Sequence, residues 1–476
     1  MNNQRSARDG YDSYLWYRSA AERGDPYAQF NLGLLYKHGR GVARDDRQAA
    51  QWFLKAALQG LAFAQNHLGV LYYNGRGVPP SDRAAVRWFR RAAGQGDASA
   101  QQNLALMYKK GRGVPRNDEA ALSWCYLASE QGVASAQTLL GLAYSRGIGV
   151  RRNDALALAW LRKAALQNHA GAQLNLGLMY KKGQGVASCD RQALAWLRQA
   201  AAQNDPVAQR LVGVAYAEGQ GVAADPPRAF AWLLRAAEQE DADAQFNLGI
   251  LLATGRTGIP RDDELAFSWY YRAAQSGHML AQYNLAGMYA RGRGAARDDA
   301  HALAWYLRAA EQGAASAQFN AAVMYANGQG TSRDEVRAVL WYRRAAAQGD
   351  ASAQNNLGVM YASGHGVPAD ERVAANWYAR AARQGHALAQ INLGAMYGSG
   401  RGVERDAARA FMWMCLAAEK GEAAAITNCA RMAPAMSAAA MARAQKLLRR
   451  WRLRQPAQVT AQVKTQVKAQ VRIPGR

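Results

Sequence analysis

The sequence predicts an all-α protein built from about eleven helix-turn-helix units of 36 residues. Three observations predict this fold. Tryptophan recurs every 36 residues from Trp16 to Trp413, with one interval of 37. The pair Ala-Gln recurs eleven times at the same period, from Ala28-Gln29 to Ala389-Gln390. Within each unit, apolar residues follow the 3.6-residue spacing of an amphipathic helix. A fixed period of this length indicates a repeat protein, in which each unit packs on its neighbours.

Composition excludes several classes of protein. Only four of the 476 residues are cysteine, which excludes a disulfide-dense secreted scaffold. No apolar run approaches the ~18 residues of a membrane-spanning helix, so we expect no integral membrane segment. The first residues reach Asp9 and Asp12 without an apolar stretch, so we expect no secretory signal peptide and a cytoplasmic protein. Export by another route stays open.

The first half of each unit predicts a helix that we call helix A. In the first unit, Asp25 is a good N-cap and Pro26 suits the first helical position, where no N–H is needed. Gly39 suits the left-handed conformation that ends a helix. Between them lies an apolar stripe of Ala28, Leu32, Leu35 and Tyr36.

The second half predicts a second helix, helix B. Asp45 is the expected N-cap, and among the equivalent positions only Cys189 lacks a capping side chain. Helix B then carries Trp52 and ends at Gly60. The 37-residue interval has its extra residue in Gly255–Gly258, between two helices, so we expect the helices to stay in phase. The recurring Gly-x-Gly-Val between the helices follows a helix rather than a strand, so we interpret it as a helix end, not a phosphate-binding loop.

These residues together resemble a known repeat. The pattern Ala-Gln-x-Asn-Leu-Gly-x-x-Tyr-x-x-Gly-x-Gly-Val, followed by Trp and Ala-Ala, resembles the Sel1-like repeat, a relative of the tetratricopeptide repeat. Residues 349–361 show it with few departures. The resemblance covers about residues 9–432 and implies a right-handed α-solenoid with helix A on its concave side. It also implies a scaffold or adaptor for a protein or peptide partner rather than an enzyme.

The repeats divide the chain into four expected segments. An N-terminal segment with an orphan helix covers residues 1–24, and eleven repeats cover 25–421. Residues 422–454 hold a degenerate repeat helix and a capping helix with Ser437 as its N-cap. Residues 455–476 form a basic tail that we expect to be disordered. From Ala423 onwards there are eleven Lys and Arg and no acid, so nucleic acid or an anionic membrane surface is an alternative partner for this end.

No pattern predicts catalysis, a metal or a cofactor. His169, His278 and His386 occupy the N-cap position of helix A in units far apart, so they cannot share a metal. The four cysteines form no Cys-x-x-Cys pair. A cell-wall or β-lactam hydrolase, claimed for cysteine-rich relatives, is disfavoured because the paired cysteines of those relatives are missing.

The candidate partner-binding residues lie on helix A. We call residues at the same place in successive units a column, numbered by its member in the first unit. With Ala28 at 0°, the apolar stripe centres near ~20°, and columns 30 and 37 fall opposite at about 200° and 180°. We therefore expect these two columns to line the groove, with lysines for acidic groups and aromatic rings as apolar anchors. The candidates in them are Phe30, Lys37, Tyr73, Lys109, Lys181, Arg210, Phe246, Tyr283 and Phe319.

Column 31 is rich in asparagine. Two interpretations stay open: the amides fasten a neighbouring turn, or they hold an extended peptide backbone. A further column, three residues after Trp, carries Lys or Arg in eight units, near the end of helix B, where cations oppose the helix dipole. The column 31 candidates are Asn31, Asn103, Asn175, Asn247, Asn284, Asn320, Asn356 and Asn392.

Overall fold

The computed structural model describes the backbone of residues 2–454 and the side chains of residues 11–453. These residues form α-helices and one 3-10 turn, without a strand. The expected tail, residues 455–476, lies outside the described residues. The helices A are α2 (Pro26–His38), α4 (Ala62–Asn74), α6 (Ala98–Lys110), α8 (Ala134–Arg146), α10 (Ala170–Lys182), α12 (Pro206–Glu218), α14 (Ala242–Thr254), α16 (Met279–Arg291), α18 (Ala315–Asn327), α20 (Ala351–Ser363) and α22 (Ala387–Ser399). The helices B are α3 (Asp46–Leu58), α5 (Asp82–Gly94), α7 (Asp118–Glu130), α9 (Asp154–Leu166), α11 (Asp190–Ala202), α13 (Pro226–Glu238), α15 (Asp263–Gln275), α17 (Asp299–Glu311), α19 (Glu335–Ala347), α21 (Glu371–Arg383) and α23 (Ala407–Ala418).

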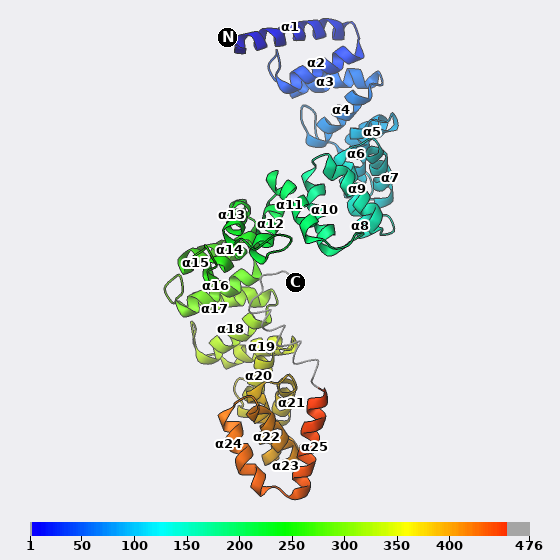
Figure 1. Cartoon of the computed structure of the whole chain (residues 1–476). Coiled ribbons are helices and arrows are strands. Elements are labelled where there is room, and N and C mark those ends of the chain that lie inside the picture. Colours follow the sequence, from blue (N-terminus) through cyan, green and yellow to red (C-terminus); the bar gives the residue numbers. More distant parts are fainter. Residues whose placement is uncertain (1, 455–476) are drawn as a thin grey trace. The chain divides into compact units, whose positions relative to one another are not determined.

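The remaining helices close the array at its two ends. They are α1 (Asn2–Glu22), α24 (Ala423–Met432), the 3-10 turn η1 (Ala433–Ala435) and α25 (Ala438–Arg454). The chain divides into a first compact unit, residues 1–215 and 219–224, and a second, residues 216–218 and 225–476. Within each unit, helices A and B alternate in packing, as α3 packs on α2 of its own repeat and on α4 of the next (Figure 1). This confirms the prediction of an all-α repeat solenoid.

The expected caps fix where the helices begin. Asp25 accepts a hydrogen bond from the N–H of Ala28 at 2.7 Å, and Asp45 accepts from Arg47 and Gln48. Where helix A begins at histidine, Nδ1 takes the same role, as in His386, which accepts from Ala389 at 3.2 Å. These bonds satisfy N–H groups that the first turn of a helix leaves without a partner.

The loop glycines have two different structural roles. Gly39 has φ 69° and ends α2 in the left-handed conformation, as expected. Gly77, the second glycine of its Gly-x-Gly, also has a positive φ, and a Cβ there would lie 1.9 Å from the carbonyl oxygen of Asp46 in the preceding repeat. The arginine between two such glycines reaches the same place, since Arg76 Nε lies 3.2 Å from Asp46 Oδ2. The motif is therefore a contact between repeats.

The core of each repeat is wider than its apolar stripe. Gln29 is buried because its side-chain N–H donates to the carbonyl oxygen of Ala21, at the end of the preceding helix. Gly33 is buried because Phe53 of helix B lies against it, and a Cβ there would lie 2.7 Å from the ring. Columns 29 and 33 are buried in the same way along both units. Measured with Ala28 at 0° as above, columns 29 and 33 lie at about 100° and 140°, so the buried side of helix A extends that far around the helix.

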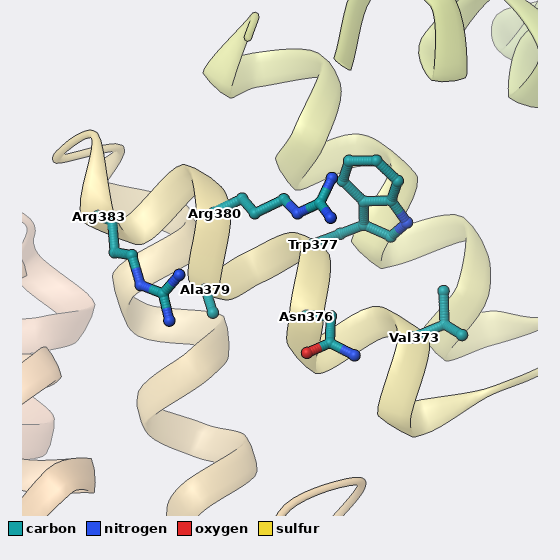
Figure 2. Close-up of a pocket in the computed structure, with 6 residues that line it drawn as sticks. All are labelled: Val373, Asn376, Trp377, Ala379, Arg380 and Arg383. Atoms are coloured by element: carbon teal, nitrogen blue, oxygen red, sulfur yellow. The ribbon is translucent and has the colours of Figure 1, made fainter. Parts of the chain in front are cut away.

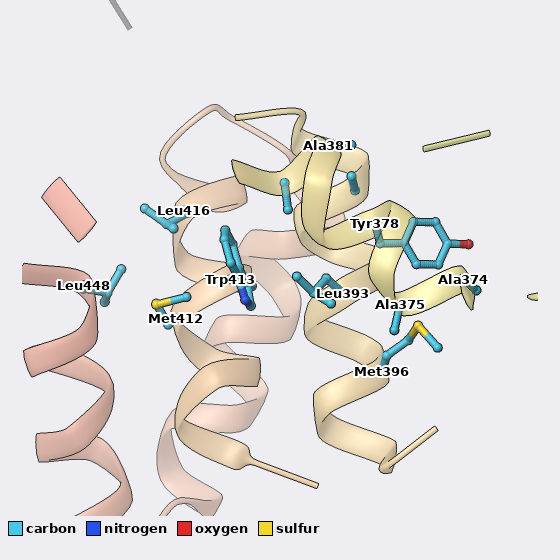
Figure 3. Packing of buried hydrophobic residues seen from close by; sticks show 12 residues of the cluster. Ala374, Ala375, Tyr378, Ala381, Leu393, Met396, Met412, Trp413, Leu416 and Leu448 are labelled. Atoms are coloured by element: carbon cyan, nitrogen blue, oxygen red, sulfur yellow. The ribbon is translucent and has the colours of Figure 1, made fainter. Parts of the chain in front are cut away.

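The second unit ends in a small core closed by α25. Ser437 accepts from the N–H of Ala440, as expected for an N-cap. Leu448 of α25 packs beside Trp413 and Met412 of α23 (Figure 3), and the rings of Trp413 and Trp451 lie 4.9 Å apart. The capping helix thus covers apolar side chains of α23.

The insertion lies in a loop, as expected. α14 ends at Thr254 and α15 begins at Asp263, and within this loop Arg256 and Ile259 exchange backbone hydrogen bonds of 2.8 Å. The helices on both sides keep their 13-residue length.

Candidate interaction surface

The exposed face of helix A differs from the expected one. Because columns 29 and 33 are buried with the apolar stripe, the buried side of the helix centres near ~60° rather than ~20°. The opposite direction, near ~240°, holds columns 27, 34 and 38. Tyr27 is 62% exposed and Phe63 is 56% exposed, both in column 27. The prediction that columns 30 and 37 lie opposite the core is therefore wrong, by an angle of about 40° to 60° around the helix.

Column 30 lies where helix A meets its neighbours. Phe246 is only 4% exposed and stacks on His278, so the prediction that it is an exposed anchor is wrong. Phe30 is half-buried between Phe53 of its own helix B and His67 of the next helix A. Tyr283 and Phe319 are also half-buried, each against a tyrosine of helix B. The physical reason is that column 30 is sandwiched between two helices, so its rings fill space within the protein.

The asparagines of column 31 bond within the protein at several repeats. Asn103 donates to Asn66 at 2.9 Å, and Asn392 donates to Asn355 at 3.1 Å, in each case to column 30 of the preceding helix A. Asn320 lies 3.5 Å from the hydroxyl of Tyr283 in the same arrangement. Elsewhere Asn175 donates to Gly171 within its helix, and Asn356 donates to Tyr342. These contacts agree with the first interpretation, in which the amides fasten neighbouring segments.

The other asparagines and the column 37 residues vary in their surroundings. Asn247 is buried, whereas Asn31 and Asn284 are half-buried. Lys109 is exposed, and Lys37, Lys181 and Arg210 are half-buried. Tyr73 is covered by the guanidinium of Arg112 at 4.2 Å from its ring centre. Partner binding by these candidate residues stays a prediction.

The outward columns differ strongly between repeats. Column 27 reads Tyr27, Phe63, Ser99, Ser135 and Gly171 in α2 to α10, then Asp243, Leu280, Ser316, Ser352 and Leu388 in α14 to α22. Column 34 is aliphatic nearly throughout: Leu34, Val70, Leu106, Leu142 and Leu178, then Ile250, Gly287, Val323, Val359 and Ala395. Column 27 thus ranges from aromatic rings to serine and glycine, beside a nearly constant apolar column 34.

The cations that follow tryptophan have a role that the sequence did not show. Lys55 Nζ lies 3.9 Å from the centre of the Trp52 ring, and Arg380 lies 4.5 Å from that of Trp377. Eight repeats share this stacking, which stabilises the charge over the ring and shields the indole from water. Figure 2 shows Arg380 beside Trp377, with Asn376 and Arg383 on the same helix. These residues line a hollow of about 470 Å³. All its lining residues come from α21, so it is an open hollow on one helix.

Other candidate chemistry is sparse. Among the described side chains, no group of three His, Cys, Asp or Glu could hold a metal ion. The Sγ atoms of Cys415 and Cys429 lie 3.4 Å apart, a proximity that spacing along the sequence did not reveal. Burial raises the pKa of the Cys415 thiol to about 12, so it stays protonated at neutral pH.

In the part of the chain that the structure describes, no helix is both long and apolar enough to span a membrane.

Comparison with known proteins agrees with this geometry. The Sel1 repeat model matches residues 7–25, 26–61, 62–97, 98–133, 134–169, 170–205, 206–241, 242–278, 280–313, 315–350, 351–386 and 387–422. A crystal structure of a protective antigen of uropathogenic Escherichia coli strains, which displays an SLR fold, is 36% identical, with a TM-score of 0.78, over 92% of this chain and 94% of that chain. A Sel1 repeat protein from Oxalobacter formigenes is 37% identical, with a TM-score of 0.51, over 64% of this chain and 87% of that one. No curated protein matches the chain. Repeats that cover nearly all of residues 7–422, on a frame shared with these structures, show that the chain belongs to the Sel1 repeat family.

Proposed function

We propose that this chain is a non-enzymatic scaffold that binds a protein or peptide partner on the outward faces of its helices A. Sel1 repeat proteins are generally scaffolds for protein interactions. The observation that carries the proposal is that buried residues of helix A are nearly the same in every repeat, whereas the outward side chains of column 27 vary. Packing keeps the buried columns 28, 29 and 32 nearly constant, whereas the more exposed column 27 changes from Tyr27 and Phe63 to serine and glycine within one unit. This variation gives the first two repeats different contacts for a partner from those of the repeats that follow.

The test compares two faces of the first unit. The double variant Tyr27→Ser and Phe63→Ser removes exposed rings of helix A, and the control Leu58→Ser and Leu166→Ser removes exposed leucines of helix B, 68% and 72% exposed. Proteins bound by each full-length variant are captured from the source cell and identified by mass spectrometry. A partner lost with the helix A pair and kept with the helix B pair supports the proposal. An identical set of partners for the wild type and both variants contradicts it.

Nucleic acid or an anionic membrane is the second candidate partner, through the basic C-terminal end. Lys446, Arg449 and Arg450 are exposed on α25, and none of them pairs with an acid among the described residues. Charge-driven binding of this kind falls steeply as salt rises. Binding of single-stranded DNA and of phosphatidylserine vesicles should be measured at low and high salt, with and without residues 455–476. No binding at low salt removes this candidate.

A further inference from the structure

The first five helices A carry charge of only one sign. α2, α4, α6, α8 and α10 contain neither Asp nor Glu. Four of them end in basic residues, which together form what we call the basic strip: Lys37, His38, Lys109, Lys110, Arg146, Lys181 and Lys182. All lie at the C-terminal ends of the helices, in column 38 on the outward side and in column 37 at its edge, about 60° from the outward direction. The acidic caps of these helices A, Asp25 and Asp97, lie at the opposite ends of their helices, whereas Asp45, which caps helix B, lies near the C-terminal end of α2, where its N–H bonds to the carbonyl oxygen of Tyr36.

The lysines and arginine of the basic strip have no partner among the residues that the structure describes. Their side chains make no ion pair or hydrogen bond with another described residue. By contrast, loop arginines of the same unit bind aspartates, such as Arg112 with Asp82 at 2.8 Å and Arg152 with Asp154 at 2.7 Å. Unpaired like charges on one face repel one another, and that repulsion is relieved by an anionic partner.

Helix stability alone does not explain the basic strip. Cations near the end of a helix do oppose its dipole. In the second unit, however, columns 37 and 38 of α14, α16, α18, α20 and α22 hold Ala, Gly, Ser, Thr and Asn, with Arg291 as the one cation among them. Those helices have the same 13-residue length and the same glycine end. The fold therefore does not require lysine there.

Neighbouring helices bring the strip and the apolar column together. Phe30 of α2 contacts His67 of α4, and Asn103 of α6 bonds to Asn66 of α4, so consecutive helices A lie side by side. Thr138 of α8 likewise lies 3.2 Å from His169 at the start of α10. Burial is the main reason why the pKa of His67 on the next helix is lowered, and the nearby side chains of Lys37 and His38 lower it further. The aliphatic column 34, from Leu34 to Leu178, runs along the same outward side.

We infer that the outward face of α2 to α10 binds an acidic, extended protein segment, whose carboxylates meet the basic strip and whose apolar side chains contact column 34. This inference rests on the proposed scaffold function and names the chemistry of its partner. The aliphatic column favours a peptide over a nucleic acid, because phosphate backbones offer it no apolar contact. Helices packed ~9 Å apart would place α2 and α10 about 36 Å apart, which matches about 12 residues of extended chain.

A direct binding measurement tests the inference. The probe is a fluorescent peptide of about 12 residues in which Asp and Glu alternate with Leu and Phe, and its control carries Asn and Gln in place of the acids. The full-length quadruple variant Lys109→Gln, Lys110→Gln, Lys181→Gln and Lys182→Gln should bind the acidic peptide about ten-fold more weakly than the wild type at low salt. The matched control removes four exposed cations from helices B of the same unit: Arg83→Gln, Arg87→Gln, Arg162→Gln and Arg191→Gln. It should bind like the wild type.

Each other outcome overturns the inference. Equal loss in both quadruple variants shows an effect of net charge alone, and equal binding of the amide peptide shows that the carboxylates are not recognised. Tighter binding of a single-stranded oligonucleotide that depends on the same lysines assigns the strip to nucleic acid. Thermal unfolding of each variant checks that it is folded. A cellular partner that the helix A quadruple variant still captures leaves the scaffold function standing and removes only the acidic segment.

Discussion

The side-chain Nε2 of Gln59 donates to the Oε1 of Gln29 at 2.8 Å, and so joins the end of helix B to the start of helix A in one repeat. Gln59 also donates to the carbonyl oxygen of Gly24, just before the first repeat, and Gln131 likewise donates to Gly96 of the preceding repeat, so a single side chain holds two neighbouring segments. The same pairing between glutamines recurs in most repeats. It is missing where Ser276 takes the place of the second glutamine, and there the Oε1 of Gln245 is buried without a hydrogen bond.

Ser276→Gln should therefore stabilise the second unit. Ser276 has φ −75° and ψ 5°, close to the −81° and 3° of Gln59, so the new side chain can leave the backbone in the same direction. Supplying a donor to a buried acceptor should raise the free energy of unfolding by about 1 kcal/mol. Urea unfolding followed by circular dichroism measures it. The reverse change, Gln312→Ser, should lower the stability by a similar amount, and no change in either variant would contradict this account.

Acid should loosen the start of α22 through its histidine cap. His386 must be neutral at Nδ1 to accept from Ala389, and burial lowers its pKa below the usual value. Since the unfolded chain then binds a proton more readily than the folded one, stability falls as pH drops below about 6.5. His386→Asp should remove this loss, because Asp350 caps α20 in the same way without a histidine. The difference in unfolding free energy between pH 7 and pH 5 tests it.

The converse variant is the control for that experiment. Asp350→His should introduce acid sensitivity at α20 that the wild type lacks there. Equal sensitivity in the wild type and the His386→Asp variant would show that the histidine cap does not titrate in this range.

Alkaline pH should destabilise the second unit through its buried tyrosines. Burial raises the pKa of Tyr306 and that of Tyr378 to about 12. The unfolded chain loses these protons near pH 10 and the folded chain does not, so stability falls between pH 10 and pH 12, by about 2 to 3 kcal/mol for each residue. Tyr306→Phe and Tyr378→Phe should retain that stability at pH 12. The exposed Tyr27→Phe is the control, and an equal alkaline loss in all three variants would exclude the buried hydroxyls as its source.

Gly77→Ala should be far more damaging than an equivalent change at Gly60. Both glycines have a positive φ, 71° and 95°, so alanine is strained at either position, by about 1 to 2 kcal/mol. Only at Gly77 would the Cβ also collide with backbone, the carbonyl of Asp46. We expect more than ~3 kcal/mol for Gly77→Ala, because backbone cannot move aside as a side chain can. Thermal and urea unfolding should separate the two variants; equal costs would remove the contact between repeats as the reason for this glycine.

The helices and their limits could be predicted from sequence because local chemistry determines them. Asp25, Pro26 and Gly39 act within one turn of their own position, so their caps are visible in the spacing alone. The inserted residue near Gly258 could be placed in a loop for the same reason.

The exposed face could not be predicted correctly because burial here depends on partners distant in sequence. Gln29 is polar and Gly33 has no side chain, so neither contributed to the apolar pattern, yet a backbone carbonyl and the Phe53 ring bury them. Because columns 29 and 33 were left out of the buried stripe, the outward face was expected in the wrong direction, at column 30, which includes Phe246. The contact between Cys415 and Cys429 was also hidden, because it depends on how α23 and α24 cross.

The interlocking of Gly77 with Asp46, and of Gln59 with Gly24, also bears on how the chain folds. Each such contact joins residues about one repeat apart, so a newly formed pair of repeats already contains all the kinds of contact that stabilise the finished array. Closing so short a loop costs little conformational entropy, and formation of local contacts is fast. Folding of each unit can therefore begin at any stable pair of repeats and spread in both directions, and refolding rates should respond most to substitutions at whichever pair starts the process.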